Sequence, residues 1–161
     1  MKNIFLILSL CMAVAFTSCK SDYGTFYEDN RPEVPVTFPG TTTYGFNPYI
    51  TKSIKDSTAA IEFTLSIPES SGRTIKEITR VSGGGTSINA GGVATATYIA
   101  TPIAGSGTTA KFTTSLSQFK AKSAANRALV VANGEIAFMF LVTLDNGDTI
   151  IPVQVRVRIT A

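Results

Sequence analysis

The chain has 161 residues, of which 44% are hydrophobic and 16% are charged, which is enough for one domain with a buried core. The formal net charge of +3 is small, and the basic residues are scattered along the chain, so we expect no nucleic acid as a partner. The sequence contains no histidine and only two cysteines. Because these residues are the usual zinc ligands, we expect no metal site and no cofactor.

The first element is an almost unbroken apolar segment over residues 4–16, preceded by the basic Lys2 and followed by Thr17 and Ser18. A basic start, an apolar run of this length and small residues before a cleavage point are typical of a secretory signal peptide. The run is shorter than the roughly 20 apolar residues that a membrane-spanning helix needs. We therefore expect residues 1–18 to be a cleaved signal peptide.

Cys19 stands at the predicted cleavage point, and the segment resembles a bacterial lipoprotein signal. The resemblance implies that the Cys19 sulfur carries a diacylglyceryl group and that this residue becomes the new N-terminus. Two or more acyl chains form a stable membrane anchor. Residues 19–39 are rich in charged residues and prolines, so we expect an extended tether. The alternative is that Cys19 is a spare thiol.

The rest of the chain, residues 40–161, shows mostly β patterns. Residues 60–68 alternate apolar and polar, which predicts a strand. Residues 74–82 predict a second strand, whose irregular period indicates either a bulge or a short helical alternative. Residues 93–101 and 110–114 predict further strands, and residues 115–126 predict the one helix. At the end of the tether, Val34, Val36 and Phe38 alternate as an edge strand does.

The C-terminal segment predicts a β-hairpin. Two alternating apolar runs, over residues 136–144 and 151–159, flank Asn146-Gly147, the strongest short hairpin signal. A two-residue type I′ turn would place Val142 opposite Ile151, Phe138 opposite Val155 and Glu135 opposite Arg158. In this register both apolar sets, Ile151 and Val153 included, face the core. About seven short strands and one short helix predict an all-β fold, a two-sheet antiparallel sandwich.

Catalytic chemistry has few candidates in this sequence. Without histidine the commonest general base is missing, and the carboxylates Glu62, Glu69, Glu77 and Glu135 show no spacing that indicates a catalytic pair. We predict that the protein is not an enzyme, with a glycosidase-like hydrolase as the remaining catalytic alternative. The residues Asp145–Asp148 could be part of a calcium loop, but a hairpin turn explains them more simply. Arg156 and Arg158 form a polar stripe, either a solvated face or a contact for an acidic partner.

The aromatic residues are the best candidates for ligand contact. Tyr44, Phe46, Asn47 and Tyr49 lie close together around Pro48, and Tyr98 lies on one of the predicted strands. Aromatic rings with an amide nearby would suit a glycan, through stacking and directional hydrogen bonds. The alternative is that Tyr44 and Phe46 are core residues, because they alternate.

The two ends of the chain resemble a known family. The lipobox Ser18-Cys19 with Lys20-Ser21-Asp22, the proline-containing tether and the closing segment FMFLVTLDNGDTI resemble SusE-like surface lipoproteins, which are encoded beside SusC/SusD-type glycan importers. The resemblance implies an immunoglobulin-like domain, a lipid anchor in the outer membrane, facing the cell surface, and binding of a glycan or an envelope protein. The alternative is a structural or adhesive surface subunit without a small ligand.

Overall fold

The computed structural model describes residues 32–44 and 46–161, and its compact unit spans Val34–Ala161. The predicted signal peptide, Cys19 and the tether as far as residue 31 lie outside the described residues. Val34 and Phe38 are buried in the core, so the last part of the predicted tether packs with the β domain.

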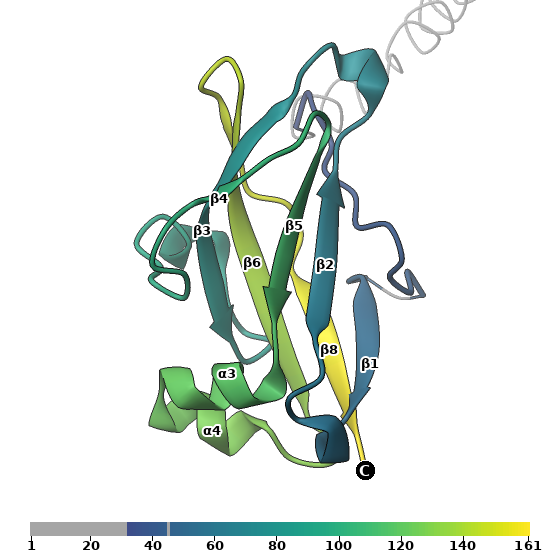
Figure 1. Cartoon of the computed structure of the whole chain (residues 1–161), viewed down its shortest axis with the longest axis vertical. Coiled ribbons are helices and arrows are strands. Elements are labelled where there is room, and N and C mark those ends of the chain that lie inside the picture. The colour runs from purple at the N-terminus through teal and green to yellow at the C-terminus, as the bar shows by residue number, and fades with distance from the viewer. Residues whose placement is uncertain (1–31, 45) are drawn as a thin grey trace, which may run out of the picture. The chain divides into compact units, whose positions relative to one another are not determined.

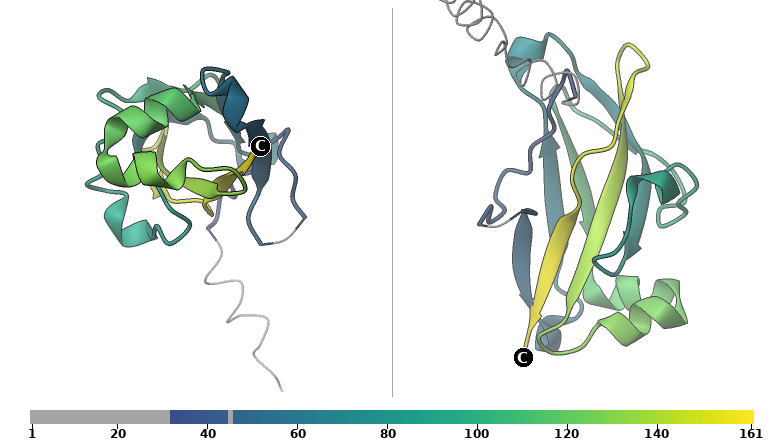
Figure 2. Two further views of the ribbon diagram at one scale, coloured as in Figure 1. Left: turned by 90° about the horizontal axis from the view of Figure 1, so that it is seen from below. Right: turned by 180° about the vertical axis from the view of Figure 1, so that it is seen from behind.

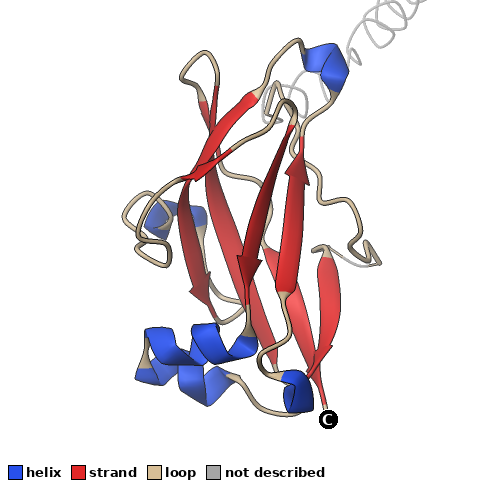
Figure 3. Ribbon diagram, viewed as in Figure 1, coloured by secondary structure: helices blue, strands red, loops and turns tan. Residues whose placement is uncertain are grey.

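The described chain is mostly β, with eight strands and two short α-helices (Figures 1 and 3). The larger sheet has the strand order β1-β8-β6-β3-β4, with β7 paired to β6, and the smaller sheet consists of β2 and β5. The elements are β1 (Tyr49–Ser53), β2 (Ile61–Ser66), β3 (Ile75–Gly84), β4 (Ile103–Ala104), β5 (Thr109–Thr114), α3 (Leu116–Lys122), α4 (Ala124–Leu129), β6 (Glu135–Leu144), β7 (Thr149–Ile150) and β8 (Val155–Thr160).

The predicted all-β class is confirmed, but one strand pair differs from the antiparallel expectation. β1, which the sequence pattern did not predict, runs parallel to β8 with Tyr49 beside Arg156 and Thr51 beside Arg158. The remaining strand pairs are antiparallel. β1 therefore forms one edge of the larger sheet, and β4 forms the other.

The core lies where apolar side chains of the two sheets meet. Phe63 of β2 and Phe112 of β5 pack against Phe138 of β6, with ring centroids 6.1 and 5.4 Å apart. Both centroid distances and the tilted rings suit favourable aromatic contact. The predicted alternation of β2 is confirmed, because Ile61, Phe63, Leu65 and Ile67 are all buried.

The irregular period of β3 comes from β-bulges, as one of the two sequence readings had it. The register against β6 shifts between Ile75 and Glu77 and again between Ile78 and Arg80. Each extra residue rotates the following side chains, so Ile75, Ile78 and Val81 all point into the core despite their spacing of three.

The C-terminal hairpin has the predicted register only in the part that is far from its turn. Glu135 pairs with Arg158 and Phe138 with Val155, as expected. Near the turn the prediction is wrong by one residue, because Val142 pairs with Ile150 and not with Ile151. The cause is the loop: Gly147 donates to the carbonyl of Leu144, and the N–H of Leu144 donates to the carbonyl of Asp148. Among the loop residues 145–147, only Gly147 has a positive φ, 91°, so the loop is a three-residue turn with a left-handed glycine and not type I′.

The residues between β7 and β8 absorb this shift. Over residues 151–154 the chain leaves the ladder, Pro152 turns inward and Ile151 and Val153 turn outward. The prediction that Ile151 and Val153 face the core is therefore wrong. A one-residue change of register transfers side chains to the opposite face of a sheet, and here it leaves two aliphatic side chains in solvent.

Two other predictions in the middle of the chain are corrected. Residues 93–101 are not a strand but an irregular segment, in which Val93 and Tyr98 are buried. The predicted helix over residues 115–126 is two helices, α3 and α4, because Ser123 is extended (φ −162°, ψ 163°). Ser115 and Ser123 each accept a hydrogen bond from the backbone three residues later, the usual N-cap arrangement. No helix in residues 32–161 that the structure describes is long and apolar enough to cross a membrane.

Candidate functional site

The aromatic loop, residues 42–49, leads into β1 at the edge of the larger sheet. Two backbone hydrogen bonds close it: Thr42 donates to Tyr49 over 2.8 Å, and Tyr49 donates to Thr42 over 2.9 Å. Tyr44 is 87% exposed and Phe46 is 101% exposed, so neither is a core residue, and the core alternative for these two rings is wrong. The loop therefore presents two aromatic side chains to solvent from a base that is fixed by backbone bonds.

The other two predicted residues of this loop are only partly exposed. Asn47 and Tyr49 are half-buried, and the guanidinium of Arg158 lies 3.7 Å from the centroid of the Tyr49 ring. Arg158 also binds Glu135 over 2.8 Å, and Arg156 binds the same carboxylate over 3.2 Å. Tyr49 is thus fixed by a cation–π contact that belongs to an ion-pair network on the outer face of the sheet.

The exposed rings lie at the same end of the β1–β8 pair as two exposed aliphatic residues. Because β1 and β8 are parallel, the residues before each strand lie at the same end of the pair, and Arg156 donates to the carbonyl of Pro48 over 2.9 Å. In Figures 1 and 2 the aromatic loop projects outward beside β1. We call Tyr44, Phe46, Ile151 and Val153 the apolar patch; these are four of the five large hydrophobic residues that are exposed in the described chain.

Tyr98, the fifth predicted contact residue, does not belong to this patch. Its backbone N–H donates to Val81 of β3, so it lies on the opposite side of the sheet from β1, with β6 and β8 between. Its ring packs in the core against Phe112, Phe119 and Phe138. Gly83 permits this position, because a Cβ there would lie 2.8 Å from the Tyr98 ring.

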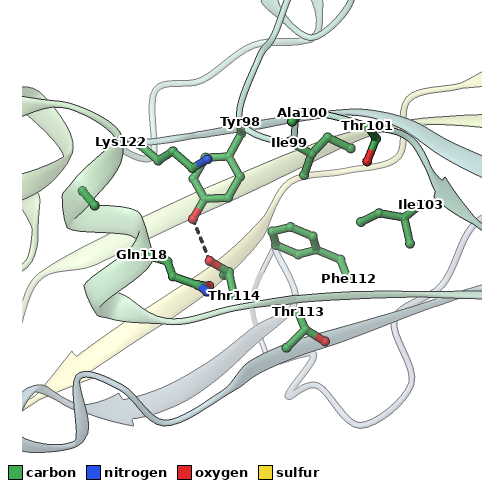
Figure 4. A pocket seen from close by; sticks show the side chains of 11 residues that line it. Tyr98, Ile99, Ala100, Thr101, Ile103, Phe112, Thr113, Thr114, Gln118 and Lys122 are labelled. Carbon is green, nitrogen blue, oxygen red and sulfur yellow. Dashed lines mark hydrogen bonds between the residues drawn. The ribbon is translucent and has the colours of Figure 1, made fainter.

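Tyr98 lines two neighbouring cavities. We call the larger, of about 510 Å³, the edge cavity; it lies between the segment that leads into β4, the strand β5 and helix α3, and Figure 4 shows its lining. The second, of about 280 Å³, lies between β3 and the start of α4. Lys122 lines both, and its ammonium lies 5.0 Å from the Tyr98 ring centroid.

The Tyr98 hydroxyl is buried and shares a 2.8 Å hydrogen bond with the Thr114 hydroxyl. Burial raises the pKa of Tyr98 above its usual value of 10.0, and the bond to Thr114 offsets a part of that rise. This phenol is therefore neutral at physiological pH and acts as a hydrogen-bonding core residue.

The carboxylates considered as catalytic candidates are placed apart from these cavities. Glu62 binds Lys111 over 2.9 Å, Glu135 binds the two arginines, and Glu77 accepts from Thr79. Neither cavity has an aspartate or glutamate among its lining residues. Among the described residues, no group of three His, Cys, Asp or Glu side chains is placed to hold a metal ion.

Sequence reasoning missed three of these features. Ile151 and Val153 read as core residues, and only the three-residue loop exposes them. Lys122 gave no signal of a binding residue, because its neighbour Tyr98 is distant in the sequence.

In comparisons with known proteins, no family model, no curated protein and no solved structure matches the chain.

Proposed function

We propose that the protein is a non-enzymatic accessory protein of the bacterial cell envelope. An acylated Cys19 anchors it to the outer membrane, and its aromatic loop binds a glycan. The observation that carries the proposal is the exposure of Tyr44 and Phe46 on a loop closed by backbone hydrogen bonds. Exposed apolar groups that gather at one place mark binding surfaces.

The chemistry of the loop suits a sugar. Aromatic faces offer apolar area at small cost in conformational entropy, and the neighbouring Asn47 amide can donate and accept hydrogen bonds. The base of the loop is held in place, because Tyr49 begins β1, which pairs with β8, and its ring contacts Arg158. A contact surface that is ordered before binding loses less entropy when the ligand arrives.

A second candidate function is that of a structural or adhesive subunit that binds another envelope protein. The observation that favours it is the presence of Ile151 and Val153 in the apolar patch. Aliphatic side chains contribute little to sugar stacking, but they are ordinary components of a protein interface. The two functions therefore differ in which half of the patch they need.

We also propose that the β domain is immunoglobulin-like, in line with the SusE-like resemblance. In that fold one sheet contains strands B and E, and the other the order G-F-C, extended by C′ in variable-type domains. The pair β2-β5 and the order β8-β6-β3-β4 correspond to these two sheets. This correspondence supports the proposal, and the parallel β1 is an addition at the G edge.

Affinity electrophoresis of the full chain in gels that contain soluble polysaccharides tests the first function. We expect at least one polysaccharide to retard the wild-type protein, and Tyr44→Ala and Phe46→Ala each to weaken binding about tenfold, the loss of one stacked ring. Val153→Ala is the matched control and should leave retardation unchanged. Binding that survives both aromatic substitutions, or no retardation by any polysaccharide, would contradict the proposal. Loss of a co-purifying envelope protein with Val153→Ala would support the second function.

A further inference from the structure

We propose that the free edge of β5 is a strand-addition site for an extended, acidic peptide segment of a partner protein. This site is separate from the aromatic loop and does not depend on the function proposed for that loop. The inference rests on three observations: the direction of the backbone groups of β5, the edge cavity beside them, and the charge of its lining.

The hydrogen bonds around β2 and β5 show which backbone groups point to the free edge. The N–H of Ile67 donates to the carbonyl of Thr108, so the even-numbered residues in and just before β5 direct their backbone N–H and C=O groups toward β2. Thr109 exchanges two hydrogen bonds with Ser106 instead, so the odd-numbered residues point the other way. By the alternation of an antiparallel ladder, Lys111 and Thr113 direct their N–H and C=O groups to this edge as well.

These groups are available for pairing. In the described part of the chain no backbone bond joins Lys111 or Thr113 to a strand on that edge, and both residues are exposed. An unpaired row of N–H and C=O groups is the template on which an extended peptide adds to a sheet. The site is thus a short edge of known register.

The edge cavity provides space for the side chains of an added strand. Figure 4 shows its residues, with Phe112 and Thr114 of β5 on one side and Ile99 and Ile103 on the other. In an added strand, every second side chain would fall on the same face as Phe112 and enter this cavity. Apolar residues at alternate positions are therefore expected in the peptide.

The charge of the lining selects an acidic partner. Lys122 is the one charged residue among those lining either cavity, and its ammonium lies over the Tyr98 ring. A carboxylate in the peptide would meet this cation in a site where no lining carboxylate competes with it. A basic peptide would place like charges together, which is unfavourable.

Selection from a phage-displayed library of random linear peptides against the full chain tests the proposal. Thr113→Pro removes the N–H that points to the free edge, and an edge strand tolerates proline. Thr113→Ala is the control, because it removes the side chain and keeps the N–H. We expect selected peptides to alternate apolar residues and to contain Asp or Glu, and their affinity to fall about tenfold or more with Thr113→Pro but not with Thr113→Ala. Lys122→Glu, which leaves the backbone intact, should exchange the acidic preference for a basic one.

Hydrogen exchange provides the second readout. The amides of Lys111 and Thr113 should exchange fast in the free protein and become protected when a selected peptide binds. The proposal is overturned if no peptide is enriched, or if the enriched peptides bind Thr113→Pro and Lys122→Glu as they bind the wild type. It is also overturned if a small anion displaces the peptides and binds to Thr113→Pro as well as it binds to the wild type. Protection that rises with protein concentration alone would identify a second copy of the chain as the occupant, which also contradicts the proposal.

Discussion

Tyr98 is of a residue type common in binding sites, but it lies in the core. Its ring contacts three phenylalanines, its hydroxyl bonds to Thr114, and the absence of a side chain at Gly83 makes room for it. Aromatic residue type alone does not distinguish these roles, because the apolar body suits a core and the hydroxyl suits a ligand. The hydrogen bond to a buried threonine is what decides it here.

Ionisation of the Tyr98 phenol should lower the stability of the domain at alkaline pH. Because its pKa is raised in the folded state, the folded protein holds the proton more tightly than the unfolded chain does. The contribution is therefore complete below pH 10.0, the usual pKa, and is lost as the pH rises through the raised pKa. We expect Tyr98→Phe to cost about 1 kcal/mol at neutral pH, because Thr114 loses its partner. Urea unfolding at a series of pH values measures both effects.

The comparison of slopes is what tests the assignment. Above pH 10.0 the free energy of unfolding of the wild type should fall more steeply than that of Tyr98→Phe. Tyr44→Phe is the control, since this ring is exposed and its hydroxyl is not buried. Equal slopes for wild type and Tyr98→Phe would show that the phenol is not held in the core.

At the scale of the elements, the C-terminal hairpin separates what the sequence predicts from what it does not. The alternation in β6 and the pairing of Glu135 with Arg158 follow from burial and from charge, and both are confirmed. The dipeptide Asn146-Gly147 predicts a turn but not its length, because a left-handed glycine occurs in two-residue and three-residue loops alike. One residue more in the loop is sufficient to expose Ile151 and Val153.

Substitutions in this turn distinguish the two loop types. Gly147→Ala should destabilise the protein by about 1 kcal/mol, because Gly147 has φ 91°, which alanine adopts at a cost. Asn146→Ala should cost less, since Asn146 has a negative φ and loses only exposed hydrogen bonds with Asp148. Denaturant midpoints measure the difference. Equal costs at the two positions would indicate the type I′ turn instead.

Other elements were missed for physical reasons of the same kind. β1 reads as a weak strand, and its pairing with β8 depends on a residue pair far apart in the sequence. Residues 93–101 alternate well enough to predict a strand, but Val93 and Tyr98 are buried from an irregular segment that makes one backbone bond to β3. The sequence predicts the aromatic residues as one site, but the fold places Tyr98 in the core beside β3 and the aromatic loop at the β1 edge of the larger sheet. Local patterns do not contain that information.

For the whole molecule, the two proposed contact sites lie on different sheets, one at the β1 edge of the larger sheet and the other at the free edge of β5 in the smaller sheet. The apolar patch adjoins β1 and β8, and the edge cavity adjoins β4 and the small sheet. A module of this kind could hold a ligand and a partner protein together. The proposed role as an accessory protein of the cell envelope requires in addition the lipid anchor at Cys19.

Mass spectrometry of the protein isolated from its native membrane tests that anchor directly. We expect the first residue to be Cys19, with a diacylglyceryl group on its sulfur, and we expect Cys19→Ala to release the protein from the membrane fraction. Residues 1–18 still attached to the mature chain, or a free thiol at Cys19, would contradict the proposed lipid anchor.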